Sequence, residues 1–161
     1  MALFQLRTPS DMLAKAKRER QRMAECIDAD NVYNFFTTVV HIADYVKHTN
    51  SVSQVDLETF RQHKVFKLSR DLCDAGKHMK LTQPGRSTPS TEVYQNSMFL
   101  APFGAWNFGP QRENWMVYSG ENWIGIFVIA DEILQLWNQF FKQHGINDES
   151  ASAFDESPPI V

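Results

Sequence analysis

The sequence predicts an all-α fold, an up-and-down helical bundle of four to five helices with a small aromatic-, Gly- and Pro-rich insertion that resembles a β-hairpin. Apolar residues recur at helical spacing in several long segments, and proline and glycine gather at about residues 86–119. The 161 residues, 43% hydrophobic and 22% charged, are typical of one globular domain. We therefore expect a single domain over residues 1–146 and an acidic, disordered tail over 147–161.

The first predicted helix begins near "TPSDM", where Ser10 is suited to cap it and Asp11 lies in the first turn. It continues through "LAKAKRERQRMAEC", whose dense charge indicates a face in contact with water. Glu19 and Glu25 interrupt the positive charge, which disfavours a nucleic-acid-binding arm. The formal net charge of −3 likewise gives the whole chain no general attraction to nucleic acid or acidic membranes.

The second predicted helix has the clearest pattern, with Asp28 or Asp30 as its expected cap. Seven apolar residues form one stripe along it: Val32, Phe35, Phe36, Val39, Val40, Ala43 and Val46. His41 and Asp44 fall on the opposite side of the helix. We therefore expect this helix to have an apolar core face and a far face that contains histidine.

The next two helices are predicted from their caps and breakers. A short helix is expected to start at Ser53 or Asp56, and a longer one to run over residues 66–81, before Pro84 and Gly85. The longer helix is apolar on one side and charged on the other. Its charged side consists of Arg70, Asp71, Asp74, Lys77 and His78. Gly76 on its apolar side is expected to allow another helix to approach closely.

The charged side of this helix is the main candidate site in the sequence. Arg70, Asp74 and His78 are spaced at i, i+4 and i+8, so they form one row along the helix. A carboxylate between an arginine and a histidine is expected to hold both charges. If the two longer predicted helices are neighbours, His41 and Asp44 are expected to lie close to this row.

The remainder of the chain is predicted to form the insertion and a central helix. The stretches "EVYQNSMFL" and "NWMVYS" have the composition of strands of a small hairpin. The last helix is expected to begin near Ser119 and to end at Gly145, which is a favourable C-terminal residue. Because this helix is apolar around most of its circumference, we expect it to lie in the middle of the bundle.

Cysteine spacing and hydropathy limit the possible cofactors and locations. Cys26 and Cys73 both lie in helical patterns beside apolar residues, which predicts buried free thiols in a reducing cytoplasm. No zinc-type spacing is present, and His41, Asp44 and His78 alone are a weak indication of a metal site, so no metal or cofactor is expected. The longest apolar run, "WIGIFVIA", is too short to cross a membrane.

Two short motifs carry a resemblance to a known family. They are "HIADYV" and "RDLCDAGKH", followed by the aromatic stretch "FLAPFGAWNFG" and by Trp137 in the last helix. Over residues 30–145 the chain resembles the HEPN superfamily of small helical proteins. More narrowly, it is similar to uncharacterised bacterial and phage-encoded HEPN-like proteins, which carry a His-x-x-Asp-aromatic pattern and then an Arg-Asp pattern that ends in Lys-His.

The resemblance implies one of two functions. Many HEPN proteins are metal-independent ribonucleases of toxin or defence systems that work as dimers, and their motif is an arginine followed closely by a histidine. Others are non-catalytic and bind nucleotides, nucleic acid or partner proteins. In this chain seven residues separate Arg70 from His78, a longer gap than the ribonuclease motif has. This departure favours a non-catalytic binding or interaction module in a toxin–antitoxin, defence or phage-related context.

The two functions use the same side chains differently. In a ribonuclease, His78 would be the acid or base beside Asp74, Arg70 and Lys77 would bind phosphate, and His41 and Asp44 would complete the site. In an interaction module these residues would form a salt-bridge network. The surface that contacts the partner would then come from Phe99, Phe103, Trp106 and Phe108. The expected partner is a second copy or another protein, with RNA as a further possibility and with no membrane.

Overall fold

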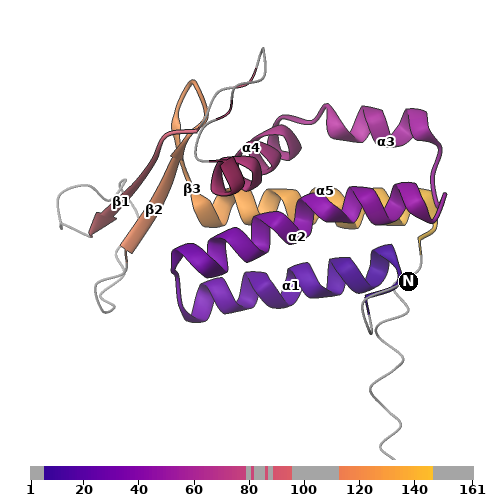
Figure 1. Cartoon of the computed structure of the whole chain (residues 1–161), viewed down its shortest axis with the longest axis horizontal. Helices are drawn as coiled ribbons and strands as arrows, with labels where there is room; N and C mark the ends of the chain where they lie inside the picture. The colour runs from indigo at the N-terminus through magenta and orange to yellow at the C-terminus, as the bar shows by residue number, and fades with distance from the viewer. Residues whose placement is uncertain (1–5, 79–80, 82–85, 87–88, 96–112, 147–161) are drawn as a thin grey trace, which may run out of the picture.

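The computed structural model describes residues 6–78, 81, 86, 89–95 and 113–146. Within these residues the helices are α1 (Pro9–Glu25), α2 (Ala29–His48), α3 (Gln54–Arg61), α4 (Lys64–His78) and α5 (Ile126–His144). The strands β1 (Thr91–Gln95), β2 (Glu113–Tyr118) and β3 (Trp123–Gly125) lie between α4 and α5 in the sequence. The described chain is thus mainly helical with one small antiparallel sheet (Figure 1), which agrees with the predicted predominance of helix.

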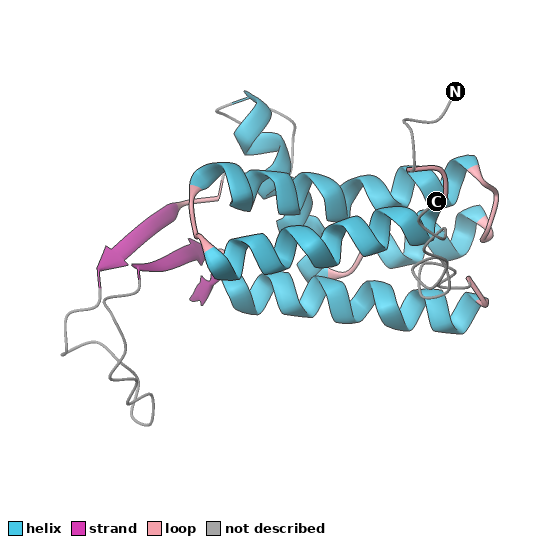
Figure 2. Cartoon of the chain, turned by 90° about the horizontal axis from the view of Figure 1, so that it is seen from below, coloured by secondary structure: helices cyan, strands magenta, loops and turns pink. Residues whose placement is uncertain are grey.

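The helices pack around α2 and α5. Helix α2 contacts each of the other four helices, and α5 contacts α1, α2, α4 and the strands β2 and β3. Figures 1 and 2 show α1, α2 and α5 as long rods side by side, with the sheet at one end of them. Strands β1 and β2 project beyond that end. None of the helices in the described part of the chain has the length and apolar composition needed to cross a lipid bilayer.

The helix starts follow from short polar side chains. Thr8 caps α1, because its Oγ1 accepts a hydrogen bond from the Asp11 N–H and the Asp11 carboxylate accepts one from the Thr8 N–H. The expectation that Ser10 caps this helix is wrong, since Ser10 lies in the first turn and is buried. Of the two caps expected for α2, Asp28 is the one that accepts the capping hydrogen bond, from the backbone of Asn31.

Trp137 joins four helices in the centre of the core. It lies on α5 and is fully buried. Its ring packs against Phe60 of α3, with ring centroids 4.0 Å apart, and against Phe66 of α4, with ring centroids 6.1 Å apart. Its Nε1 donates a hydrogen bond of 2.9 Å to the carbonyl oxygen of Val39 on α2. One side chain thus contributes both apolar area and a satisfied polar group to the helix packing.

Small residues let α4 lie close to α2. A Cβ atom at Gly76 would stand 2.6 Å from the ring of Tyr33, so the position must lack a side chain for this packing to form. One turn earlier, Cys73 is buried, and its thiol donates to the Thr37 hydroxyl at 3.6 Å. The packing role expected for Gly76 is confirmed. Both cysteines are free, but Cys26 lies exposed at the end of α1, so the expectation that it is buried is wrong.

The sheet is larger than the predicted hairpin. Its strand order is β1-β2-β3 with antiparallel pairing throughout, and Val117 of β2 faces Ile124 of β3. The last helix therefore begins later than Ser119, because residues 123–125 pair with β2 instead of extending the helix. The aromatic residues Phe99, Phe103, Trp106 and Phe108 and the tail over 147–161 lie outside the described residues.

Candidate functional site

Arg86 binds two carboxylates on the charged side of α4. Its Nε donates to Asp71 Oδ1 at 2.7 Å, and its Nη1 donates to Asp74 Oδ2 at 2.8 Å. A further contact joins Arg86 Nη2 to Asp71 Oδ1. The Arg86 side chain is only 14% exposed, so its guanidinium is largely shielded from water, and the two carboxylates are partly buried. Residue 86 is thereby bound to α4.

The cluster is a fixed charge network. Burial alone would lower the pKa of the Arg86 guanidinium, but the hydrogen bonds and charges of Asp74 and Asp71 outweigh burial and raise that pKa above its ordinary value. Arg86 therefore stays a cation at any physiological pH. Asp71 and Asp74 accept hydrogen bonds from this guanidinium, which leaves their carboxylates fewer free acceptor sites for a substrate.

The residues of the predicted row on α4, Arg70, Asp74 and His78, do not pair with one another in the structure. Asp74 pairs with Arg86, whereas the expectation was that it would pair with Arg70 and His78. Arg70 instead has its Nε 3.9 Å from Asp71 Oδ1, and that buried Nε lacks a hydrogen-bond partner within the described residues. Lys77 and His78 are exposed in the last turn of α4, where positive charge favours the helix dipole.

His41 and His78 lie at different levels along the helix pair. Tyr33 meets Gly76 and Thr37 meets Cys73, so α2 and α4 run antiparallel. Extending this register by one turn of each helix pairs His41 with residue 69, nine residues before His78. At about 1.5 Å of rise per residue, that separation is roughly 13 Å along α4. The two histidines therefore belong to different ends of the α2–α4 contact.

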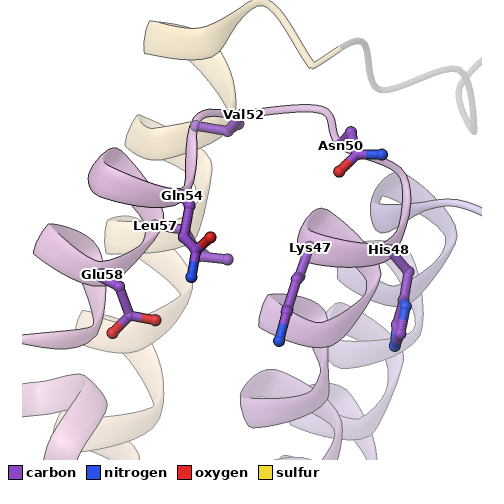
Figure 3. Close-up of a pocket in the computed structure, with 7 residues that line it drawn as sticks. All are labelled: Lys47, His48, Asn50, Val52, Gln54, Leu57 and Glu58. Atoms are coloured by element: carbon purple, nitrogen blue, oxygen red, sulfur yellow. The ribbon is translucent and has the colours of Figure 1, made fainter.

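Asp44 belongs to a second polar site, between α2 and α3. Its Oδ1 lies 3.8 Å from Arg61 Nη2, and Arg61 Nη1 also donates to Glu58 Oε1 at 2.8 Å. Next to these residues, side chains from the end of α2, the following turn and α3 line a cavity of about 290 Å³ (Figure 3). The sequence gave no indication that a groove lies between these two helices.

A third feature is an apolar surface on the sheet, which we call the outer sheet surface and define by Met116, Tyr118, Trp123 and Val128. Tyr118 and Trp123 are paired across β2 and β3, with ring centroids 5.5 Å apart. They are 40% and 39% exposed. Val128 at the start of α5 extends the surface past Gly125, which is the cross-strand partner of Met116. Val117 and Ile124 point the other way, toward the core.

Arg86 is the main functional candidate that sequence reasoning missed. It follows Pro84 and Gly85, before which the sequence predicts the helix to end, so a helical wheel of α4 cannot include it. The available signal was its positive charge. Two aspartates lie on one side of α4, and an arginine a few residues beyond the helix can supply a cation for them. Within the described residues, no three His, Cys, Asp or Glu side chains are grouped to hold a metal ion.

Replacing Arg86 with methionine is expected to lower the free energy of unfolding by about 1 kcal/mol, because two partly buried carboxylates lose their shared cation while water still reaches them. Urea unfolding followed by circular dichroism measures this change. Asp74→Asn in the Arg86→Met background should recover part of the loss by removing one of the stranded charges. An unchanged stability of Arg86→Met would show that the cluster does not stabilise the fold.

Comparisons with known proteins identified no relative of this chain. No family model matches the chain, and no curated protein and no solved structure matches it.

Proposed function

We propose that the protein is a HEPN-like, up-and-down helical bundle of the cytoplasm that acts as a non-catalytic interaction module and associates with a second copy of itself. The observation that carries this proposal is the outer sheet surface, where two large aromatic rings contact each other at a tilted angle and stay open to water. Aromatic residues of this kind are enriched at the centres of protein interfaces, where they contribute more binding energy than other residues.

The position of this surface supports association with another protein. It lies at the end of the molecule where β1 and β2 project beyond the helices (Figure 2). Small antiparallel sheets are stable when one face is covered by a core, and the inward face carries Val117 and Ile124 for that purpose. The aromatic pair on the opposite face is thus not needed to fill this core, and burying it against a partner would remove apolar area from water.

A second copy is the favoured partner because an ion pair lies beside this surface. Glu121, in the turn between β2 and β3, lies 2.7 Å from Lys64 of α4. Two copies that meet around a two-fold axis bring like residues together, and unpaired charges at such a contact would repel. An aromatic pair flanked by a neutralised ion pair avoids that repulsion.

The alternative function, metal-independent RNA cleavage, uses Arg70 and His78. Eight residues of helix place these two side chains roughly 12 Å apart along α4, so within one chain they are poorly placed to act on the same phosphate. Asp74 is already bound to Arg86. Loss of RNA cleavage in a stably folded His78→Ala variant would favour this alternative.

Sedimentation analysis over a range of concentrations tests the proposal. We expect the wild-type protein to form a dimer and Trp123→Glu to be monomeric, since a charge at that position would be buried without a partner. The matched control is Val55→Glu, which places the same charge on α3 at an apolar side chain that is 75% exposed. That variant should dimerise as the wild type does. A monomeric wild type, or a Trp123→Glu variant that still dimerises, would contradict self-association through this surface.

A further inference from the structure

The groove between α2 and α3 has opposite charges on its two walls. Lys47 extends from the last turn of α2, and Glu58 extends from α3 on the other side of the space (Figure 3). Gln54 lies between them near the turn and adds an amide that donates and accepts hydrogen bonds. A molecule in this groove would thus meet a cation on one side and a carboxylate on the other.

Both charged groups retain capacity for a ligand. Lys47 has no ion-pair partner among the residues that the structure describes. Glu58 binds Arg61 through Oε1, and its Oε2 takes no part in the 2.8 Å contact. Arg61 also lies 3.8 Å from Asp44 of α2, and its own hydrogen bond holds the Glu58 carboxylate in place on α3. An anchored carboxylate loses less side-chain entropy when it binds a ligand.

Two polar and two apolar residues complete the groove, and a tight turn joins its walls. His48 and Asn50 supply the polar part. Leu57 is buried and, together with Val52, forms the apolar part of the lining. Asn50 has a φ of 51°, in the left-handed region that asparagine tolerates better than most residues. Its backbone N–H bonds to the carbonyl oxygen of Lys47 at 3.3 Å. The chain therefore reverses direction between α2 and α3.

We propose that this groove binds a small zwitterion, a molecule with one carboxylate, one ammonium group and a short apolar part, which is the chemical class of free amino acids. The ligand carboxylate pairs with Lys47 and Gln54, its ammonium group pairs with Glu58, and its apolar part rests on Leu57 and Val52. The cavity of about 290 Å³ is at the lower limit of ligand pockets, which are roughly 300–1,000 Å³. Because the groove is open to water, binding is weak and of low selectivity among apolar amino acids.

A titration with three related probes tests this assignment, with backbone amide signals of Asn50, Gln54 and Leu57 followed by two-dimensional NMR. L-Leucine carries both charges, N-acetyl-L-leucine carries only the carboxylate, and L-leucinamide carries only the ammonium group. We expect L-leucine to bind more tightly than either analogue. Equal affinity for all three probes, or no shift of these signals with any of them, would overturn the proposal.

Two variants test which protein side chain binds each charged group of the ligand. Lys47→Gln should weaken L-leucine binding by about fivefold, the largest effect that an exposed ion pair of this kind has. It should weaken N-acetyl-L-leucine similarly and leave L-leucinamide unchanged. Glu58→Gln should show the opposite selectivity, weakening L-leucine and L-leucinamide only.

The control is Lys67→Gln, which removes an exposed lysine from α4 and should leave all three affinities unchanged. If Lys67→Gln weakens binding as much as Lys47→Gln does, the effect is one of overall charge, and the assigned site is wrong. This inference is independent of self-association, since the groove and the outer sheet surface involve different elements.

Discussion

Replacing Trp137 with alanine is expected to lower the free energy of unfolding by about 3–5 kcal/mol, the usual cost of removing a large aromatic side chain from a core. The indole ring contacts Phe60 and Phe66 and donates to the Val39 carbonyl oxygen. Its loss leaves a cavity where four helices meet. Because a domain of this size is stable by only about 5–15 kcal/mol, the variant should unfold at a much lower urea concentration.

The matched control separates the hydrogen bond from the packing. Trp137→Phe keeps most of the ring volume and removes the indole N–H, so it should cost about 1–2 kcal/mol. Val128→Ala, at an exposed position on the same helix, should change stability by about 0.5 kcal/mol or less. A Trp137→Ala variant as stable as Trp137→Phe would mean that this ring is not central to the core.

The second large effect is expected from Lys15→Met, at roughly 2 kcal/mol near neutral pH, because it strands a buried carboxylate. Glu19 on α1 is only 3% exposed. Lys15 Nζ donates to Glu19 Oε1 at 3.1 Å and to the Thr38 hydroxyl of α2 at 2.6 Å. Arg22 still reaches Glu19 at 2.8 Å, so the loss is smaller than for a carboxylate with no cation left.

The pH dependence of this variant identifies the cause. In the wild type, burial alone would raise the pKa of Glu19, but the hydrogen bonds and charges of Lys15 and Arg22 outweigh it and hold the pKa below the ordinary 4.5. The stability that this carboxylate contributes is therefore present above pH 4.5 and is lost as the pH falls through its lower folded-state pKa. Without Lys15, burial should raise the pKa of Glu19, so this carboxylate becomes protonated at a higher pH in the variant. Protonation removes the stranded charge, and the destabilisation caused by Lys15→Met therefore becomes smaller as the pH falls.

The difference in unfolding free energy between wild type and Lys15→Met should thus shrink from pH 7 to about pH 4. Urea titrations at several pH values measure it. Arg22→Met should cost less than Lys15→Met at pH 7, because Arg22 is mostly exposed. A Lys15→Met/Glu19→Gln double variant should regain much of the loss. A stability difference that stays constant with pH would mean that Lys15 acts through packing and not through charge.

The helical elements were predictable because their signals are local. The spacing of Phe35, Phe36 and Val39 defines the core face of α2. The capping residues and Gly145 predict where helices begin and end to within a few residues. The start of α5 was not predictable in this way. The stretch "NWIG" has the composition of either a helix or a strand, and its pairing with β2 decides between them.

The candidate site was less predictable than the fold because side-chain partners depend on segments far apart in the sequence. A helical wheel places Asp74 between Arg70 and His78, and all three do lie on the outward side of α4. Which cation Asp74 binds depends on where residue 86 returns, and the partner of Asp44 depends on the angle between α2 and α3. The apolar periodicity of a single helix predicts neither the partner of Asp74 nor the partner of Asp44.

The position of Trp137 at the meeting point of four helices also has a consequence for synthesis on the ribosome. Helices α1 to α4 leave the exit tunnel before α5, and during that interval the faces of Val39, Phe60 and Phe66 that α5 covers have no partner from their own chain. Such nascent chains expose apolar surface and are prone to aggregate or to bind chaperones. Slow translation of the segment between α4 and α5 would lengthen that exposure, so yield in cells should depend on codon choice there as well as on the stability of the finished fold.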